Sequence, residues 1–272
     1  MIKSSVVVSL GATRFKGVAF QGRIEERFRF LSGLGFNGVE LGIRNPREVD
    51  YSALIKLVER YKLEVPAIGT GQAFIEEGLC LTTKQARVRE QARKRLLSHL
   101  ELGSKLDAYV IIGLIRGIPE AERKEDAKKI LVEELKFLCN RADEIGVRGL
   151  LLEPLNRYET SIINSLGEAM SIIEKVGAEN LGILADSFHI NLEERDIEGS
   201  IISAGKRVWH IHLSDSNRHY PGAGHFDFNS LFQALEKIGY EGYISGEFMP
   251  EPNEEEAVLG FADFLKKRGL LR

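Results

Sequence analysis

The feature that most constrains the fold is an alternation that occurs eight times along the 272 residues, in which a short apolar run precedes an amphipathic stretch of helical spacing. The apolar runs are six or seven residues long and rich in Val, Ile and Leu, which is typical of buried strands. Several helical stretches end in glycine, as expected just past a helix C-terminus. The predicted strands are Ser4–Leu10, Gly38–Ile43, Glu64–Gly69, Ala108–Gly113, Arg148–Glu153, Leu181–Asp186, Val208–Leu213 and Tyr243–Phe248.

Eight strands alternating with eight helices predict an α/β protein of the (β/α)8 TIM-barrel class, with residues 1–272 forming one domain. No Pro/Gly-rich linker or shift of composition divides the chain. The weakest helical pattern lies at Ile197–Ala204, between the sixth and seventh strands. A doubly wound open sheet is the alternative, but the first strand is followed by SLGATRFKG, which lacks the GxGxxG phosphate-binding pattern. The barrel is therefore favoured.

Charge and cysteine content exclude several classes of function. The chain has 37 basic and 40 acidic side chains, a net charge of −3, and so lacks the basic balance typical of nucleic-acid or membrane-surface binding. Its two cysteines, Cys80 and Cys139, cannot form a disulfide framework or a CxxC site, which indicates a reducing cytoplasm. The N-terminal apolar run is too short for a signal peptide or a membrane span.

Polar residues interrupt or end five of the predicted strands. In a TIM barrel the carboxyl ends of the strands face the active site, so these residues are candidates for function. The three carboxylates from strands five, six and eight would repel one another unless a cation neutralised them. Together with the imidazole from strand seven, they form a donor set that suits Mn²⁺, Mg²⁺ or Co²⁺. The five residues are Glu40, Glu153, Asp186, His212 and Glu247.

Other interpretations of these residues stay open at this stage. A single acidic residue at a strand end is often a helix cap or a partner of a loop arginine, and for Glu40 that is at least as plausible as a functional role. Glu153 could in the same way pair with Arg157. His210 lies two residues before His212 and shares its face of the strand, but one layer deeper, which favours a supporting role over metal ligation.

Three loop residues have simple structural interpretations. Asp227 is expected to cap the helix that follows it. Arg14 and Arg116 lie in the loops after the first and fourth strands, where a solvated charge is favoured and the binding of a substrate phosphate is the alternative.

Four stretches of the second half of the chain resemble the xylose-isomerase-like barrel superfamily, specifically the ketose 3-epimerases related to D-tagatose and D-psicose 3-epimerase. They are LLEPLNRYET (Leu151–Thr160), LADSFHIN (Leu184–Asn191), HIHLSDSNRHYPGAGHFDF (His210–Phe228) and GYEGYISGEF (Gly239–Phe248). The general pattern spans nearly the whole chain. Around the fourth strand, YVIIGLIRGIP departs from the free-sugar epimerases, and with Arg116 there a phosphorylated ketose stays open as the substrate.

The resemblance implies roles for seven residues. Glu153, Asp186, His212 and Glu247 would hold a divalent metal, with Mn²⁺ expected and Co²⁺ or Mg²⁺ as alternatives. Glu153 and Glu247 would also be the acid/base pair that acts on C3 of a ketose, through a cis-enediolate whose O2 and O3 the metal bridges. Substrate would be bound near its O1–O2 end by Glu159, His189 and Arg218.

The expected function is therefore a cytoplasmic, metal-dependent isomerase of carbohydrate metabolism that acts on a small ketose, with a dimer or tetramer as the assembly implied by the resemblance. Alternatives are a sugar-phosphate 3-epimerase and an aldose–ketose or hydroxypyruvate-type isomerase on the same scaffold. An abasic-site endonuclease would need more histidines on several strands and a basic groove, neither of which six histidines and a charge of −3 provide. A non-catalytic sugar-binding protein is the most distant alternative, because the whole set of candidate ligands and acid/base residues is present.

Overall fold

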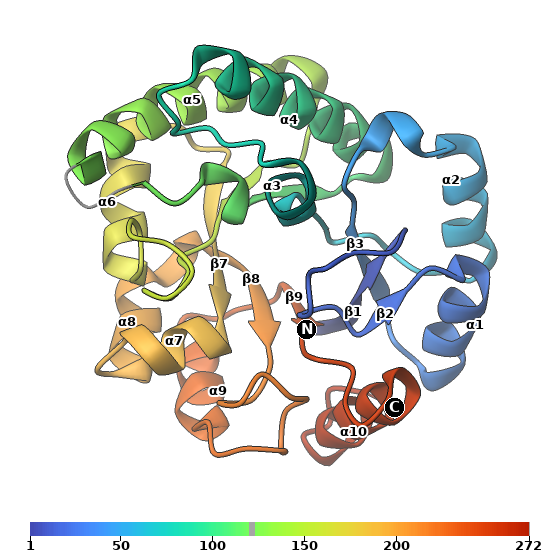
Figure 1. Ribbon diagram of the computed structural model, residues 1–272. Coiled ribbons are helices and arrows are strands. Elements are labelled where there is room, and N and C mark those ends of the chain that lie inside the picture. Colours follow the sequence, from blue (N-terminus) through green and yellow to red (C-terminus); the bar gives the residue numbers. More distant parts are fainter. Residues whose placement is uncertain (120–122, 272) are drawn as a thin grey trace.

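A computed structural model, which describes residues 1–119 and 123–271, contains eight parallel strands closed into a barrel (Figure 1). Each strand pairs with the next along the chain, and the last pairs with the first. The (β/α)8 barrel prediction is confirmed. The strands are β1 (Lys3–Ser9), β3 (Gly38–Gly42), β4 (Ala67–Gly69), β5 (Tyr109–Ile112), β6 (Leu150–Leu152), β7 (Leu181–Asp186), β8 (Val208–Leu213) and β9 (Tyr243–Gly246), and a two-residue strand that the sequence did not predict, β2 (Phe20–Gln21), lies beside β1.

Helices surround the barrel, as expected from the amphipathic stretches (Figure 1). The weak pattern before β8 does form a helix, and Asp227 caps the helix after β8, as predicted, by accepting hydrogen bonds from two backbone N–H groups. The outer helices are α1 (Ile24–Leu34), α2 (Tyr51–Arg60), α4 (Ala86–Leu106), α5 (Lys124–Ile145), α6 (Leu166–Val176), α8 (Ile197–Ala204), α9 (Phe228–Lys237) and α10 (Glu254–Lys267).

Short helical segments follow several strands at the carboxyl end of the barrel. Two of them, α3 (Gly71–Glu77) and α7 (Ser187–Glu193), were not predicted. Each lies between a strand and the outer helix that follows it. Single 3-10 turns follow β3 and β5, η1 (Pro46–Glu48) and η2 (Leu114–Arg116), and a third, η4 (Gly205–Arg207), lies at the other end of the barrel, between α8 and β8.

The strand alternation divides side chains between the barrel interior and the layer under the helices. On β3, Val39 and Leu41 belong to the large core shared with the helices, so Glu40 between them points inward. The inside of the barrel has an apolar part and a polar part. Ala67, Ile111, Leu151 and Leu184 form a small apolar cluster, whereas Ser5, Glu40, His210, His212 and Ser245 are buried and hydrogen-bonded to one another.

The sequence also predicted that the cysteines form no disulfide framework and that the chain has no membrane span. Cys80 and Cys139 are both free thiols. Over residues 1–119 and 123–271, every helix is too short or too polar to cross a membrane.

Candidate active site

Four of the five polar residues at the strand ends meet at the carboxyl end of the barrel. Glu153 directly follows β6, Asp186 is the last residue of β7, His212 is the fifth residue of β8, and Glu247 directly follows β9. One ligand atom from each lies within 4.8 Å of the others, and all four side chains are buried. The structure therefore brings together the four residues that the sequence singled out as a metal-ligand set.

His212 presents one ring nitrogen to the three carboxylates. Its Nδ1 lies 3.4 Å from Glu247 Oε2, 3.8 Å from Glu153 Oε1 and 3.8 Å from Asp186 Oδ2. This nitrogen is buried and has no hydrogen-bond partner. Burying a polar atom without a partner costs free energy, and a metal ion bound to this nitrogen would remove that cost. One imidazole nitrogen and three carboxylate oxygens fit a divalent cation such as Mn²⁺ or Mg²⁺.

The carboxylates of the cluster are not electrostatically equivalent. Burial, and then the negative charge of Glu247, raises the pKa of Glu153 well above its usual value. Burial alone would also raise the pKa of Asp186, but several stabilising contacts, of which the Arg218 guanidinium is the largest, together outweigh burial and hold that pKa well below its usual range. A cation at the cluster would reverse the first effect, because it stabilises the ionised form of Glu153.

The Arg218 guanidinium contributes positive charge to the carboxylate cluster. Its Nη1 donates to Asp186 Oδ2 at 2.8 Å, and its Nη2 pairs with Glu247. The guanidinium also lies over the Phe188 ring, 4.8 Å from its centroid. Arg218 thus borders the pocket with its charge already shared between two of the candidate ligands.

His189, a predicted substrate-binding residue, is held in one tautomer by Asn156. The backbone N–H and the side-chain amide N–H of Asn156 both donate to His189 Nδ1, at 3.2 and 2.9 Å. Because Nδ1 accepts both hydrogen bonds, the proton of the His189 ring is on Nε2. Burial lowers the pKa of His189 to about 3, so the ring is neutral. Its Nε2–H lies 3.9 Å from both Glu153 Oε1 and Asp186 Oδ2, where it can donate to a bound molecule.

Asn156 also binds Glu159, the third predicted substrate-binding residue. Its Nδ2 donates to Glu159 Oε1 at 2.9 Å, and Glu159 borders the pocket. Burial raises the pKa of the Glu159 carboxyl. The sequence analysis did not single out Asn156, although it lies three residues before Glu159 within the LLEPLNRYET motif.

The pocket above the four candidate ligands has further walls, formed by residues to which no role was predicted. The GTGQAFIEEG segment forms α3, whose start places Thr70 and Gln72 in the wall, and Gln72 donates to Ser9 Oγ at 2.8 Å. A Cβ at Gly113 would collide with Glu153 Oε2, so this glycine leaves room for the carboxylate. The apolar wall consists of Val7, Phe15, Val18, Ile111, Leu114 and Leu155.

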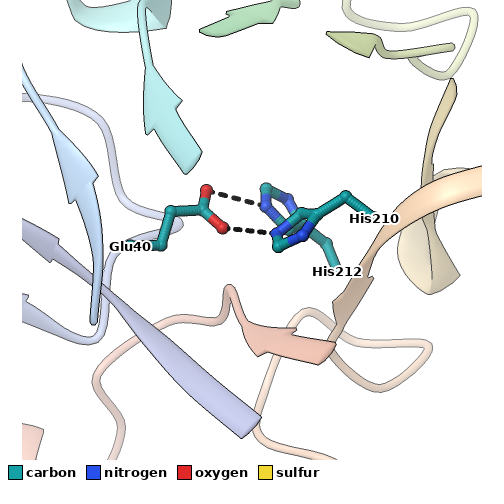
Figure 2. A group of neighbouring side chains, drawn as sticks. All are labelled: Glu40, His210 and His212. Atoms are coloured by element: carbon teal, nitrogen blue, oxygen red, sulfur yellow. Dashed lines mark hydrogen bonds and ion pairs between the residues drawn. The ribbon is translucent and has the colours of Figure 1, made fainter. Parts of the chain in front are cut away.

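Two of the alternative interpretations are wrong. Glu40 is neither a helix cap nor the partner of a loop arginine, because its carboxylate lies inside the barrel between two histidines of β8 (Figure 2). Arg157 does not pair with Glu153; it binds Glu193 instead, with Nη2 2.9 Å from Oε2. The carboxylate of Glu153 therefore remains directed at the cluster.

Arg116 is not a solvated charge and does not bind a phosphate, contrary to both interpretations of it. Its side chain is completely buried, and its guanidinium donates to three backbone carbonyls: Gly113 O at 3.0 Å, Glu153 O at 2.7 Å and Ile163 O at 3.2 Å. No carboxylate is needed to hold it, because three carbonyl dipoles from the two loops after β5 and β6 converge on it. Arg116 thereby fixes the backbone that carries Glu153.

Replacement of Arg116 is expected to destabilise the fold. Arg116→Met leaves three buried carbonyls without a donor, and we expect the free energy of unfolding to fall by about 3–5 kcal/mol. Thermal and urea unfolding measure the change. Arg14→Met is the matched control, because Arg14 is mostly exposed and its guanidinium pairs at the surface with Glu76 and the Ile75 carbonyl. An unchanged midpoint for Arg116→Met would contradict this role.

Comparison with known proteins identifies the class to which this architecture belongs. A family model described as "Xylose isomerase-like TIM barrel" matches residues 28–268. The chain therefore belongs to the xylose isomerase-like TIM barrel family, as the resemblance implied.

Several relatives of the chain are named sugar epimerases. A D-psicose 3-epimerase of Enterocloster bolteae is 31% identical over 221 residues, which cover 78% of this chain and 72% of the relative. A 3-dehydro-D-guloside 4-epimerase of Escherichia coli is 27% identical over 246 residues, covering 83% and 87%. The structure of a D-psicose 3-epimerase from Clostridium cellulolyticum with D-tagatose superposes with a TM-score of 0.82 at 21% identity, over the full length of both chains.

Proposed function

We propose that the protein is a divalent-metal-dependent ketose 3-epimerase. The observation that carries the proposal is the convergence of Glu153, Asp186, His212 and Glu247 within 4.8 Å, with the His212 Nδ1 unpartnered. The curated 3-epimerases among its relatives support the same reaction. Mn²⁺ is the proposed metal, with Co²⁺ or Mg²⁺ able to fill the same donor set.

Two glutamates are proposed to move the proton at C3. Glu153 and Glu247 follow β6 and β9, with β7 and β8 between them, so their carboxylates reach the pocket from separate parts of the barrel wall. One removes the C3 proton and the other returns a proton to the opposite face, which inverts that carbon; in the reverse reaction they exchange roles. A bound divalent cation supplies the positive charge that stabilises the enediolate as it develops.

Three residues are proposed to orient the ketose at its O1–O2 end. The Nε2–H of His189 is a fixed neutral donor, because Asn156 occupies the other ring nitrogen. Arg218 also donates into the pocket, and Glu159 accepts from a sugar hydroxyl. A fixed orientation places C3 and not C2 or C4 between the two glutamates.

The pocket favours an unphosphorylated ketose. Among the described residues that line it, Arg218 is the only arginine or lysine, and its guanidinium is shared between Asp186 and Glu247. Lys16 lies exposed at the outer mouth. Arg116, the residue that left a phosphorylated substrate open, is buried against backbone carbonyls. A phosphate in the pocket would thus find no free cation.

The experiment is incubation of manganese-loaded protein with free and phosphorylated ketoses, followed by separation and NMR identification of the products. The proposal predicts the C3 epimer of a free ketose as product, with the 6-phosphates converted more slowly. Formation of an aldose would assign the protein to the aldose–ketose isomerases. Inversion at C4 would place it with the 4-epimerase relative instead, and a bound but unchanged sugar would indicate a binding protein.

A further inference from the structure

A second buried cluster lies directly beneath the proposed metal ligands. The Glu40 carboxylate reaches from β3 to two histidines of β8, as Figure 2 shows. Its Oε2 lies 2.7 Å from His210 Nε2, and its Oε1 lies 2.8 Å from His212 Nε2. All three side chains are only about 1% exposed. Because β1 and β9 separate β3 from β8, these bonds cross the barrel interior and are not contacts between neighbouring strands.

The geometry fixes which nitrogen of His212 is free. Both oxygens of Glu40 are within hydrogen-bond distance of a ring nitrogen, and a carboxylate accepts at both oxygens. His212 therefore presents its N–H at Nε2 to Glu40. The remaining nitrogen, Nδ1, is the atom that faces Glu153, Asp186 and Glu247 without a partner, and it is therefore the one whose lone pair a metal at the cluster would take.

We infer that Glu40 is a positioning residue that holds His212 as the Nε2–H tautomer, with its Nδ1 lone pair directed at the metal. The inference rests on the metal centre of the proposed function. A ligand histidine whose second nitrogen donates to a carboxylate is fixed in tautomer and ring orientation and is a stronger base, and loss of such a partner typically weakens metal binding about 10–100-fold.

His210 also contributes to this arrangement, because its hydrogen bond to Glu40 keeps the Glu40 carboxylate away from the metal. A buried glutamate beside a cation is drawn to become a ligand itself. Here the second oxygen of Glu40 is bound by His210 Nε2, which also lies 3.0 Å from Ser245 Oγ. Ser245 in turn is 2.5 Å from Ser5 Oγ. This chain of bonds anchors Glu40 one layer below the four ligands.

The first test is ¹⁵N NMR of the unmodified protein, which reports the protonation of each histidine nitrogen. In the protein loaded with diamagnetic Mg²⁺ or Zn²⁺, we expect His212 to carry its proton on Nε2 alone. A proton on Nδ1 of His212 in the loaded protein, or metal-induced loss of the proton on Nε2, would overturn the inference. The measurement needs no variant and no activity.

The second test is metal titration of Glu40→Gln, followed through the EPR signal of free Mn²⁺. An amide can accept from only one of the two histidines, so we expect Mn²⁺ to bind about 10–100-fold more weakly, and His212 to show a mixture of tautomers. Glu134→Gln is the matched control, because Glu134 is also buried and ion-paired, with Arg93, but lies on α5. Its manganese affinity should equal that of the unmodified protein.

The outcomes separate this inference from the proposed function. If the unmodified protein binds no divalent metal, the proposed function fails. If it binds one equivalent and Glu40→Gln binds equally tightly with the same His212 tautomer, only the inference on Glu40 fails. Two equivalents that fall to one in Glu40→Gln would make Glu40, His210 and His212 a second metal site, which also overturns the positioning role.

Discussion

Glu247→Gln is expected to reduce kcat for ketose epimerisation by about 10²–10⁴-fold at saturating metal, because the variant keeps the shape of the side chain but cannot carry the proton. Glu153→Gln is expected to have an effect of similar size. The two variants should differ in partial reactions. Each retains one acid/base group, so each should exchange the C3 proton with solvent from one C3 epimer only, and the two variants should favour opposite epimers.

The assay is turnover with each epimer of the ketose pair, together with deuterium uptake at C3 measured by NMR. Glu251→Gln is the control variant, since Glu251 is largely exposed and its carboxylate lies 3.5 Å from His219 Nε2. Its rate should be unchanged. Turnover of both Glu153→Gln and Glu247→Gln at the rate of the unmodified protein, with metal bound, would contradict the assignment of the acid/base pair.

Removal of the metal is the second large effect. Protein stripped by a chelator is expected to lose activity by at least about 10³-fold, because the charge that develops on the sugar oxygens then has no preorganised counter-charge. Addition of Mn²⁺ or Co²⁺ should restore it. Metal at 100 times its Kd should also raise the free energy of unfolding by about 2.7 kcal/mol.

The control for this experiment is the variant Asp186→Asn, measured by thermal unfolding with and without Mn²⁺. Asp186 is one of the four proposed ligands, with Oδ2 3.8 Å from His212 Nδ1, so the variant should lose most of the metal-dependent rise in melting temperature. Full activity of chelator-treated protein, with metal absent by elemental analysis, would contradict the proposed dependence on a cation.

The eight strands of the barrel could be predicted because each is a distinct apolar run between helical patterns. The predicted bounds of the strands were less accurate than their number and order. Glu64 was placed in the third strand, but β4 begins at Ala67, and Glu64 forms only an isolated bridge with Gly38. The short helices α3 and α7 were missed because seven residues give too little periodicity to distinguish a helix from a loop.

The ligand cluster could be anticipated because a charge at the end of a buried strand is unusual in itself. The roles of Glu40 and Arg116 could not. Both depend on contacts with residues far away in the sequence: Glu40 on β8, some 170 residues later, and Arg116 on the carbonyls of Glu153 and Ile163. Sequence pattern shows that such a residue is charged, but the fold decides what it pairs with.

The most direct test of the central claim is NMR of a ketose incubated with manganese-loaded protein in deuterium oxide, with the metal removed before the spectrum is recorded. The account predicts deuterium at C3 and the appearance of the C3 epimer, with C1 and C4 unlabelled. Deuterium at C1 or C2 with an aldose product, inversion at C4, or no exchange at any carbon with metal bound would each contradict it.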